Sequence, residues 1–133
     1  MRTQLIDALR GLTAAAVLLA AVVHLDLYEQ GFRDIATIGP LFLLDFAAGL
    51  VLGVTVLVWR HWLPVLLAAG FGAATVAAYW ISVTRGLFGV REVTGGWAEI
   101  VAETAEYAAV VFGMSAAVLL RPQRARRRAG SGS

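Results

Sequence analysis

The chain has 133 residues, of which 59% are apolar and 15% charged, and its formal net charge is +2. Soluble domains are about 25% charged, so this composition excludes an ordinary soluble enzyme, and the lack of cysteine excludes disulfides and iron–sulfur clusters. The apolar residues gather in four runs, each close to the roughly 20 residues with which a helix crosses a bilayer. The sequence therefore predicts an integral membrane protein.

The predicted spans cover residues 11–28, 40–59, 64–84 and 99–120. The first apolar run is longer than that of a signal peptide and lacks a small-x-small cleavage site, so we expect it to be retained. Pro40 and Pro64 begin the next two spans, where the first turn of a helix tolerates proline. Only residues 60–63 separate these two spans, which predicts a helical hairpin. Residues 1–121 are expected to form one domain.

Arginine placement predicts the orientation, because short cytoplasmic segments are enriched in positive charge. With the N-terminus inside, eight arginines fall in inner segments, and only Arg33, Arg85 and Arg91 fall in outer loops. We expect an all-α, antiparallel four-helix bundle with both termini cytoplasmic, in the cell membrane. Residues 122–133 form a basic tail that ends in a Gly/Ser linker, and directly after a span such a tail favours contact with anionic lipid over nucleic acid.

Acidic residues gather at the other membrane face: under this topology all of them except Asp7 lie in outer loops or in the outer halves of the spans. At 1.5 Å rise per residue, groups from all four spans reach overlapping depths, roughly 6 to 12 Å below the outer boundary. This layer comprises His24, Asp45, Tyr79, Glu103 and Glu106. Ionisable residues in a membrane are expected to face the bundle interior. The sequence predicts an outward-opening polar pocket, with Arg85 or Arg91 as its counter-ion.

The polar groups share helix faces with small residues. Asp45, Gly49 and Gly53 recur at every fourth position, and the glutamates of the last span share a stripe with Gly113. Small residues let membrane helices approach closely, so these stripes predict packing faces that carry the polar groups inward. The structural alternative is a satisfied hydrogen-bond network that selects the helix pairing and has no other role.

Several functions fit this layer. One imidazole and three carboxylates suit a divalent metal such as zinc, manganese or iron, and the candidate ligands are His24, Asp45, Glu103 and Glu106. The same groups can instead hold and release protons near neutral pH, so the pocket is predicted to bind a cation, a proton or a small polar ligand. A b-type haem is disfavoured because His61, the only other histidine, lies at the opposite membrane face.

A non-enzymatic role is the alternative: the chain can be an accessory or assembly subunit of a larger membrane complex, or form a homo-oligomer. Helix faces made of glycine and alanine pack against a partner as readily as against one another. No nucleophile motif or nucleotide-binding loop is recognisable in the sequence. Whether the chain is an enzyme is left open at this point.

The outer end of the first span, His-Leu-Asp-Leu-Tyr from His24 to Tyr28, is followed by Gly-Phe-Arg from Gly31 and by Ile-Gly-Pro-Leu-Phe-Leu-Leu over residues 38–44. These segments resemble small four-span membrane proteins of actinobacteria, and the resemblance covers chiefly the first 50 residues. A more distant similarity to DoxX-like four-span proteins rests on span number and loop length. Both imply the four-span fold, and neither carries an assigned catalytic site.

Overall fold

The computed structural model describes residues 1–89 and 96–121, and its main elements are helices. The long helices are α1 (Arg2–Glu29), α2 (Ile38–Val58), α3 (Trp62–Arg85) and α4 (Trp97–Leu120), and a short 3-10 helix, η1 (Phe32–Asp34), follows α1. Arg91 and the basic tail lie outside the described residues. All four long helices have the length and apolar composition needed to cross a membrane.

The observed helix bounds agree with the predicted ones to within two residues, except at the start of α1. This helix begins at Arg2, nine residues before the predicted position at Gly11. Its 28 residues extend about 42 Å at 1.5 Å per residue, more than the roughly 30 Å of a hydrocarbon core. The apolar run therefore predicts the part of α1 that can lie in lipid, whereas the helix continues beyond it.

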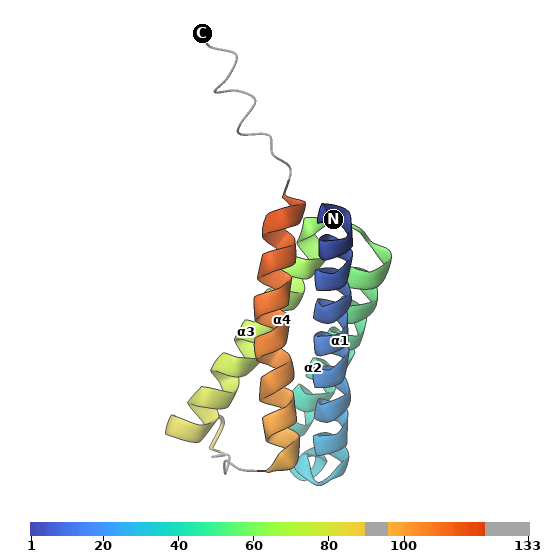
Figure 1. Cartoon of the computed structure of the whole chain (residues 1–133). Coiled ribbons are helices and arrows are strands. Elements are labelled where there is room, and N and C mark those ends of the chain that lie inside the picture. The colour runs from blue at the N-terminus through green and yellow to red at the C-terminus, as the bar shows by residue number, and fades with distance from the viewer. Residues whose placement is uncertain (90–95, 122–133) are drawn as a thin grey trace.

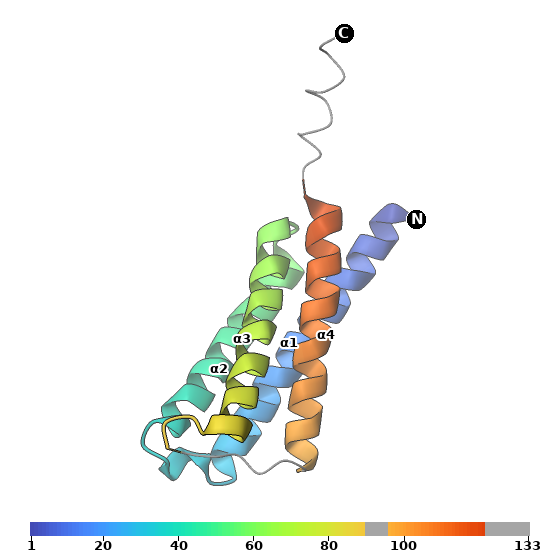
Figure 2. The same cartoon turned by 90° about the vertical axis from the view of Figure 1, so that its left-hand side faces the viewer.

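The helices divide the molecule into two ends. The terminal end is where α1 begins and α4 ends, and the distal end is where α1 and α3 end and α2 and α4 begin (Figure 1). The helix α1 packs along both α2 and α4, and α3 packs along α4, whereas α2 and α3 touch much less. Towards the distal end α3 leans away from the other helices (Figure 1), and Figure 2 shows that α1 is inclined to α4.

Small residues form most of the interior, and large apolar side chains face outward. Alanines are the commonest buried residues, and the largest fully buried side chains are those of Val17, Val56, Val65, Thr13 and Pro64. In contrast, Leu44 is 61% exposed and Val58 is 77% exposed. Lipid solvates leucine and valine well, and close helix approach requires small residues. This distribution is compatible with an integral membrane protein.

Glycines bring the helix backbones into contact. A Cβ atom at Gly72 of α3 would lie 2.8 Å from the backbone oxygen of Glu106, and one at Gly113 of α4 would lie 2.8 Å from that of Val65. Real Cβ atoms do not approach this closely, so any larger residue would push α3 and α4 apart. Two glycines of α2 meet side chains of α1 in the same way, Gly49 and Gly53.

A buried arginine joins α1 to the last turn of α2 at the terminal end. Nη2 of Arg10 donates hydrogen bonds to the backbone oxygens of Val56, at 2.6 Å, and Leu57, at 3.2 Å. The last carbonyl groups of a helix have no partner within it, and a cation there also interacts favourably with the helix dipole. Asp7 Oδ1 lies 3.5 Å from Nη1 of Arg10 and 2.8 Å from Nη1 of Arg60. The charges at this end are thus paired or used to cap a helix.

Candidate functional site

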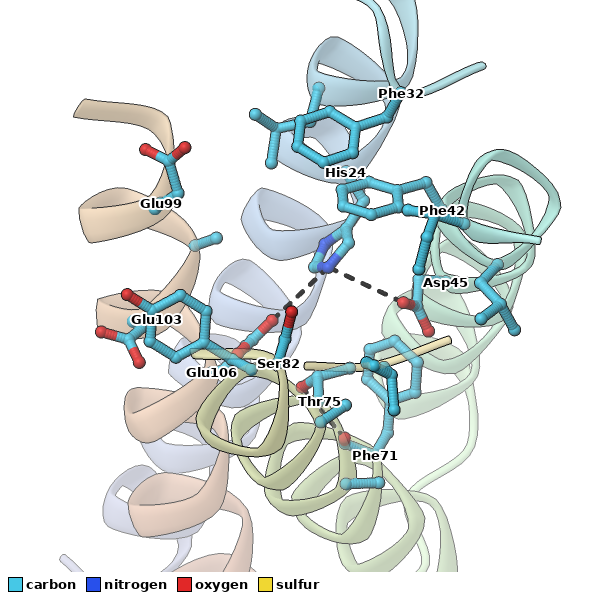
Figure 3. A pocket seen from close by; sticks show the side chains of 18 residues that line it. His24, Phe32, Phe42, Asp45, Phe71, Thr75, Ser82, Glu99, Glu103 and Glu106 are labelled. Atoms are coloured by element: carbon cyan, nitrogen blue, oxygen red, sulfur yellow. Dashed lines mark hydrogen bonds and ion pairs between the residues drawn. The ribbon is translucent and has the colours of Figure 1, made fainter. Parts of the chain in front are cut away.

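A cavity of about 240 Å³ lies in the distal half, where α3 leans away from its neighbours. All four long helices line it. Figure 3 shows His24, Asp45 and Glu106 directed toward one another, with Glu99 and Glu103 to one side of them along α4. The lining includes the five residues predicted to form the polar layer, His24, Asp45, Tyr79, Glu103 and Glu106. Apolar and aromatic side chains make up much of the remaining wall.

His24 of α1 is buried, and its two ring nitrogens have different surroundings. Nδ1 lies 2.8 Å from the backbone oxygen of Ala20, one helical turn earlier. A carbonyl oxygen can only accept a hydrogen bond, so Nδ1 carries the hydrogen in this contact. Nε2 is therefore the ring nitrogen that is left to interact with side chains of other helices.

Nε2 of His24 faces two carboxylates from two other helices. It lies 3.7 Å from Oδ2 of Asp45 on α2 and 3.7 Å from Oε1 of Glu106 on α4. The side chain of Glu106 is 4% exposed and that of Asp45 is 32% exposed. A neutral Nε2 would present its lone pair to two charged oxygens. A proton on Nε2 would instead attract both oxygens, and we call these three groups the His24 centre.

Two phenylalanines cover the His24 centre. The ring of Phe42 lies 5.3 Å from the imidazole of His24, and the ring of Phe32 from η1 stacks on Phe42 at 4.8 Å between centroids. Figure 3 shows the two rings on one side of His24, with the carboxylates at its other end. Sequence reasoning did not identify these rings as part of the site. The available signal was the spacing of Phe42 and Asp45, which puts residues three apart on one helix face.

The other two glutamates of α4 have a different environment from Glu106. Oε1 of Glu103 and Oε2 of Glu99 are buried and have no hydrogen-bond partner among the described residues. Glu99 lies in the first turn of α4, where the helix dipole favours negative charge. The sequence predicts Glu103 and Glu106 in one layer, and the structure separates their roles: Glu106 lies against His24, whereas an oxygen of Glu103 has no partner among the described residues.

The arginine counter-ions of the sequence prediction do not appear at the described part of this cavity. Arg85 is exposed, does not line the cavity and forms no ion pair with an acidic residue within residues 1–89 and 96–121. Arg91 lies outside the described residues. Among the described residues that line the cavity, His24 is the basic side chain that meets the acids.

The four candidate metal ligands do not assemble into a ligand shell. Across the described residues, no group of three or more His, Cys, Asp or Glu side chains is arranged to hold a metal ion. The 3.7 Å contacts of Nε2 are separations typical of an ion pair. The second histidine, His61, lies just before α3, where its Nδ1 accepts a hydrogen bond from the backbone nitrogen of Leu63 at 3.2 Å. It therefore has a local capping role at the terminal end, remote from His24.

Comparisons with protein-family models, curated proteins and solved structures gave no match for this chain. The resemblance to small actinobacterial and DoxX-like proteins therefore stays a prediction from the sequence.

Proposed function

We propose that this chain is an integral membrane protein that binds a cation, a proton or a small polar ligand in its distal cavity. In this proposal the four helices form an antiparallel bundle with both termini cytoplasmic, so that the distal cavity faces outward. The observation that carries it is the position of His24 Nε2, buried and 3.7 Å from each of two carboxylates at the cavity wall. The uneven distribution of arginine between the two membrane faces supports the orientation.

The charges around the cavity favour a positively charged ligand. Four acidic side chains line it, against one histidine and no arginine among the described lining residues. Inside a membrane a charged group is costly unless it is paired or reaches water. A bound cation or proton would therefore lower the free-energy cost of the carboxylates that have no positive partner among the described residues. An anion would add to it.

The test uses single cysteines, which are unambiguous because the chain has none. Ala78 on α3 lines the cavity, and Ala36 and Thr3 are exposed at the distal and terminal ends. Two membrane-impermeant methanethiosulfonates are added to intact cells, one with a trimethylammonium group and one with a sulfonate. We expect Ala36→Cys to react with both reagents from outside and Thr3→Cys to react only after lysis.

Charge selectivity at Ala78→Cys tests the binding function itself. Acidic walls concentrate cations, so the rate ratio of the cationic to the anionic reagent should exceed that at Ala36→Cys about tenfold. Replacing Asp45 by Asn in the Ala78→Cys background should reduce this excess. Equal ratios at both cysteines, or no reaction at Ala78→Cys, would exclude a cation-binding cavity open to the outside.

A second candidate function is that of an accessory subunit, and a shallow apolar groove between α1 and α4 favours it. The groove is lined by apolar side chains such as Leu12, Leu19 and Phe112, with small residues between them. Membrane helices associate through such surfaces. The mass of the chain in mild detergent separates the two cases, because an accessory subunit would be recovered with a different protein.

A further inference from the structure

We infer that the ligand of the distal cavity is an organic cation with an apolar body, such as an aryl-substituted ammonium ion. This inference rests on the proposed function, since it names the chemical class of ligand for the same cavity. It comes from three features of the cavity: its unbalanced acidic groups, its apolar and aromatic wall, and its size.

The acidic groups leave room for one more positive charge. Even when His24 is protonated, its Nε2 serves the carboxylates of Asp45 and Glu106. Oε1 of Glu103 is buried and without a hydrogen-bond partner in the described structure. A buried carboxylate oxygen in this state is costly until a donor or a positive charge reaches it. Glu103 is therefore the group that we expect to meet the cationic head of the ligand.

The rest of the wall suits an apolar body better than a hydrated ion. Leu27, Leu41 and Phe71 line the cavity together with the stacked rings of Phe32 and Phe42. Aromatic faces attract ammonium groups within about 6 Å, and burial of apolar surface adds to the binding of an organic ion. An inorganic ion would lose its hydration shell to these apolar walls, and the described carboxylates of the cavity are not arranged as a ligand shell that would replace it. The described residues also lack a metal-binding group of side chains.

The size of the cavity limits the ligand. About 240 Å³ equals the volume of about eight water molecules in the liquid, at about 30 Å³ each. This is smaller than the roughly 300 to 1,000 Å³ of pockets for drug-sized ligands. A single aromatic ring with one ammonium group is therefore the appropriate size class.

Calorimetry on the full-length protein in detergent tests the inference with three probes. Benzyltrimethylammonium has the charge and the apolar body, tetramethylammonium has the charge alone, and neopentylbenzene has the same shape without the charge. We expect benzyltrimethylammonium to bind at least about tenfold more tightly than tetramethylammonium, because it also buries an aromatic ring. It should bind about tenfold more tightly than neopentylbenzene, because it alone of the two has a positive charge for the acidic and aromatic groups. The change Glu103→Gln should weaken its binding about tenfold, and Phe42→Leu about fivefold.

The control is Glu29→Gln, which removes an exposed acidic group outside the cavity and should leave the affinity unchanged. Circular dichroism of each variant shows whether it retains its helices. Equal binding of neopentylbenzene, or unchanged affinity in a folded Glu103→Gln variant, would refute the inference. If tetramethylammonium binds as well as benzyltrimethylammonium while Ala78→Cys prefers the cationic reagent, the organic class is wrong and the cation-binding cavity stands.

Discussion

The terminal and distal halves of the bundle differ in the sign of their charged residues and in how these residues are packed. At the terminal end, Arg10 donates to the last carbonyl groups of α2, and Asp7 lies between Arg10 and Arg60. At the distal end, His24 lies 3.7 Å from each of two carboxylates, and a buried oxygen of Glu103 beside the cavity has no hydrogen-bond partner within residues 1–89 and 96–121. The terminal half places its charged groups against helix ends and against one another, although Nε of Arg10 is buried without a hydrogen-bond partner among the described residues. The distal half instead places its charged groups around a cavity.

Helix packing explains why the two halves differ. Gly113 of α4 lies against Val65, near the start of α3, and Gly72 lies against Glu106, so α3 and α4 touch at backbone distance in this part. Beyond Gly72, α3 leans away towards the distal end (Figure 1). The cavity occupies the region that this lean opens, because residues 74–82 of α3 contribute much of its wall. The polar groups of the distal half therefore lie around a cavity, whereas α3 and α4 are in close contact in the terminal half.

The largest predicted effect is in the terminal half. Methionine in place of Arg10 has a side chain similar in shape to the apolar stem of arginine, but it cannot donate either hydrogen bond to the end of α2. Hydrogen bonds to charged groups contribute about 1.5 to 3 kcal/mol, so we expect the free energy of unfolding to fall by about 2 to 3 kcal/mol, measured by detergent titration in mixed micelles.

The matched control for this change is Arg2→Met. Arg2 is exposed and donates one hydrogen bond, at 3.2 Å, to the backbone oxygen of Leu119 at the end of α4. Its replacement should have a small fraction of the Arg10 effect. If both variants lowered the free energy of unfolding by similar amounts, the effect would come from helix capping in general, and the burial of Arg10 would add nothing to it.

A smaller loss is expected at the boundary between the halves. Gly72→Ala puts a Cβ 2.8 Å from the backbone oxygen of Glu106, whereas Gly70→Ala on the same helix meets nothing within 4 Å. Overpacking costs typically 1 to 3 kcal/mol, so Gly72→Ala should destabilise the protein by about 2 kcal/mol. Gly70→Ala should be neutral or stabilising, because alanine favours a helix more than glycine does. Equal effects at both positions would contradict the close contact of α3 with α4.

The sequence predicts the four helices well because hydropathy reports directly on the length of chain that can lie in lipid. It does not predict the start of α1, since Arg2 and Arg10 continue the helix through bonds to the ends of other helices. Such bonds join residues 46 to 117 positions apart, and no local pattern contains them. Hydropathy and arginine counting identified Arg10 only as a charge outside the span.

For the candidate site, helical rise predicts which residues share a depth, and the five predicted residues do line one cavity. Depth alone cannot tell which acid meets His24. That depends on the rotation of α4 and on the lean of α3, which place Glu106 rather than Glu103 opposite Nε2. The stacking of Phe32 on Phe42 could not be predicted from the sequence either, because η1 places Phe32 there through a turn at Gly31 with φ 139°.

The smallest predicted effect measures the charge centre of the distal half. A double-mutant cycle with His24→Asn and Glu106→Gln isolates the interaction between these two side chains. Such cycles in membrane proteins average about 0.6 kcal/mol and reach about 1.7 kcal/mol. For an imidazole near two carboxylates we expect a coupling free energy of about 1 kcal/mol, from the same unfolding titrations.

The control cycle pairs His24→Asn with Asp7→Asn, which lies in the terminal half about 25 Å away along α1 at 1.5 Å per residue. These two changes should be additive within about 0.5 kcal/mol. If the coupling free energy between His24 and Glu106 were no larger than that of this control, the two side chains would have no measurable electrostatic interaction. The cavity would then have less negative charge than its acidic residues suggest, and the electrostatic basis for preferring a cation would be weakened. A coupling of the expected size shows that the centre holds a shared proton or ion pair, which is the state that a cationic ligand at Glu103 would perturb.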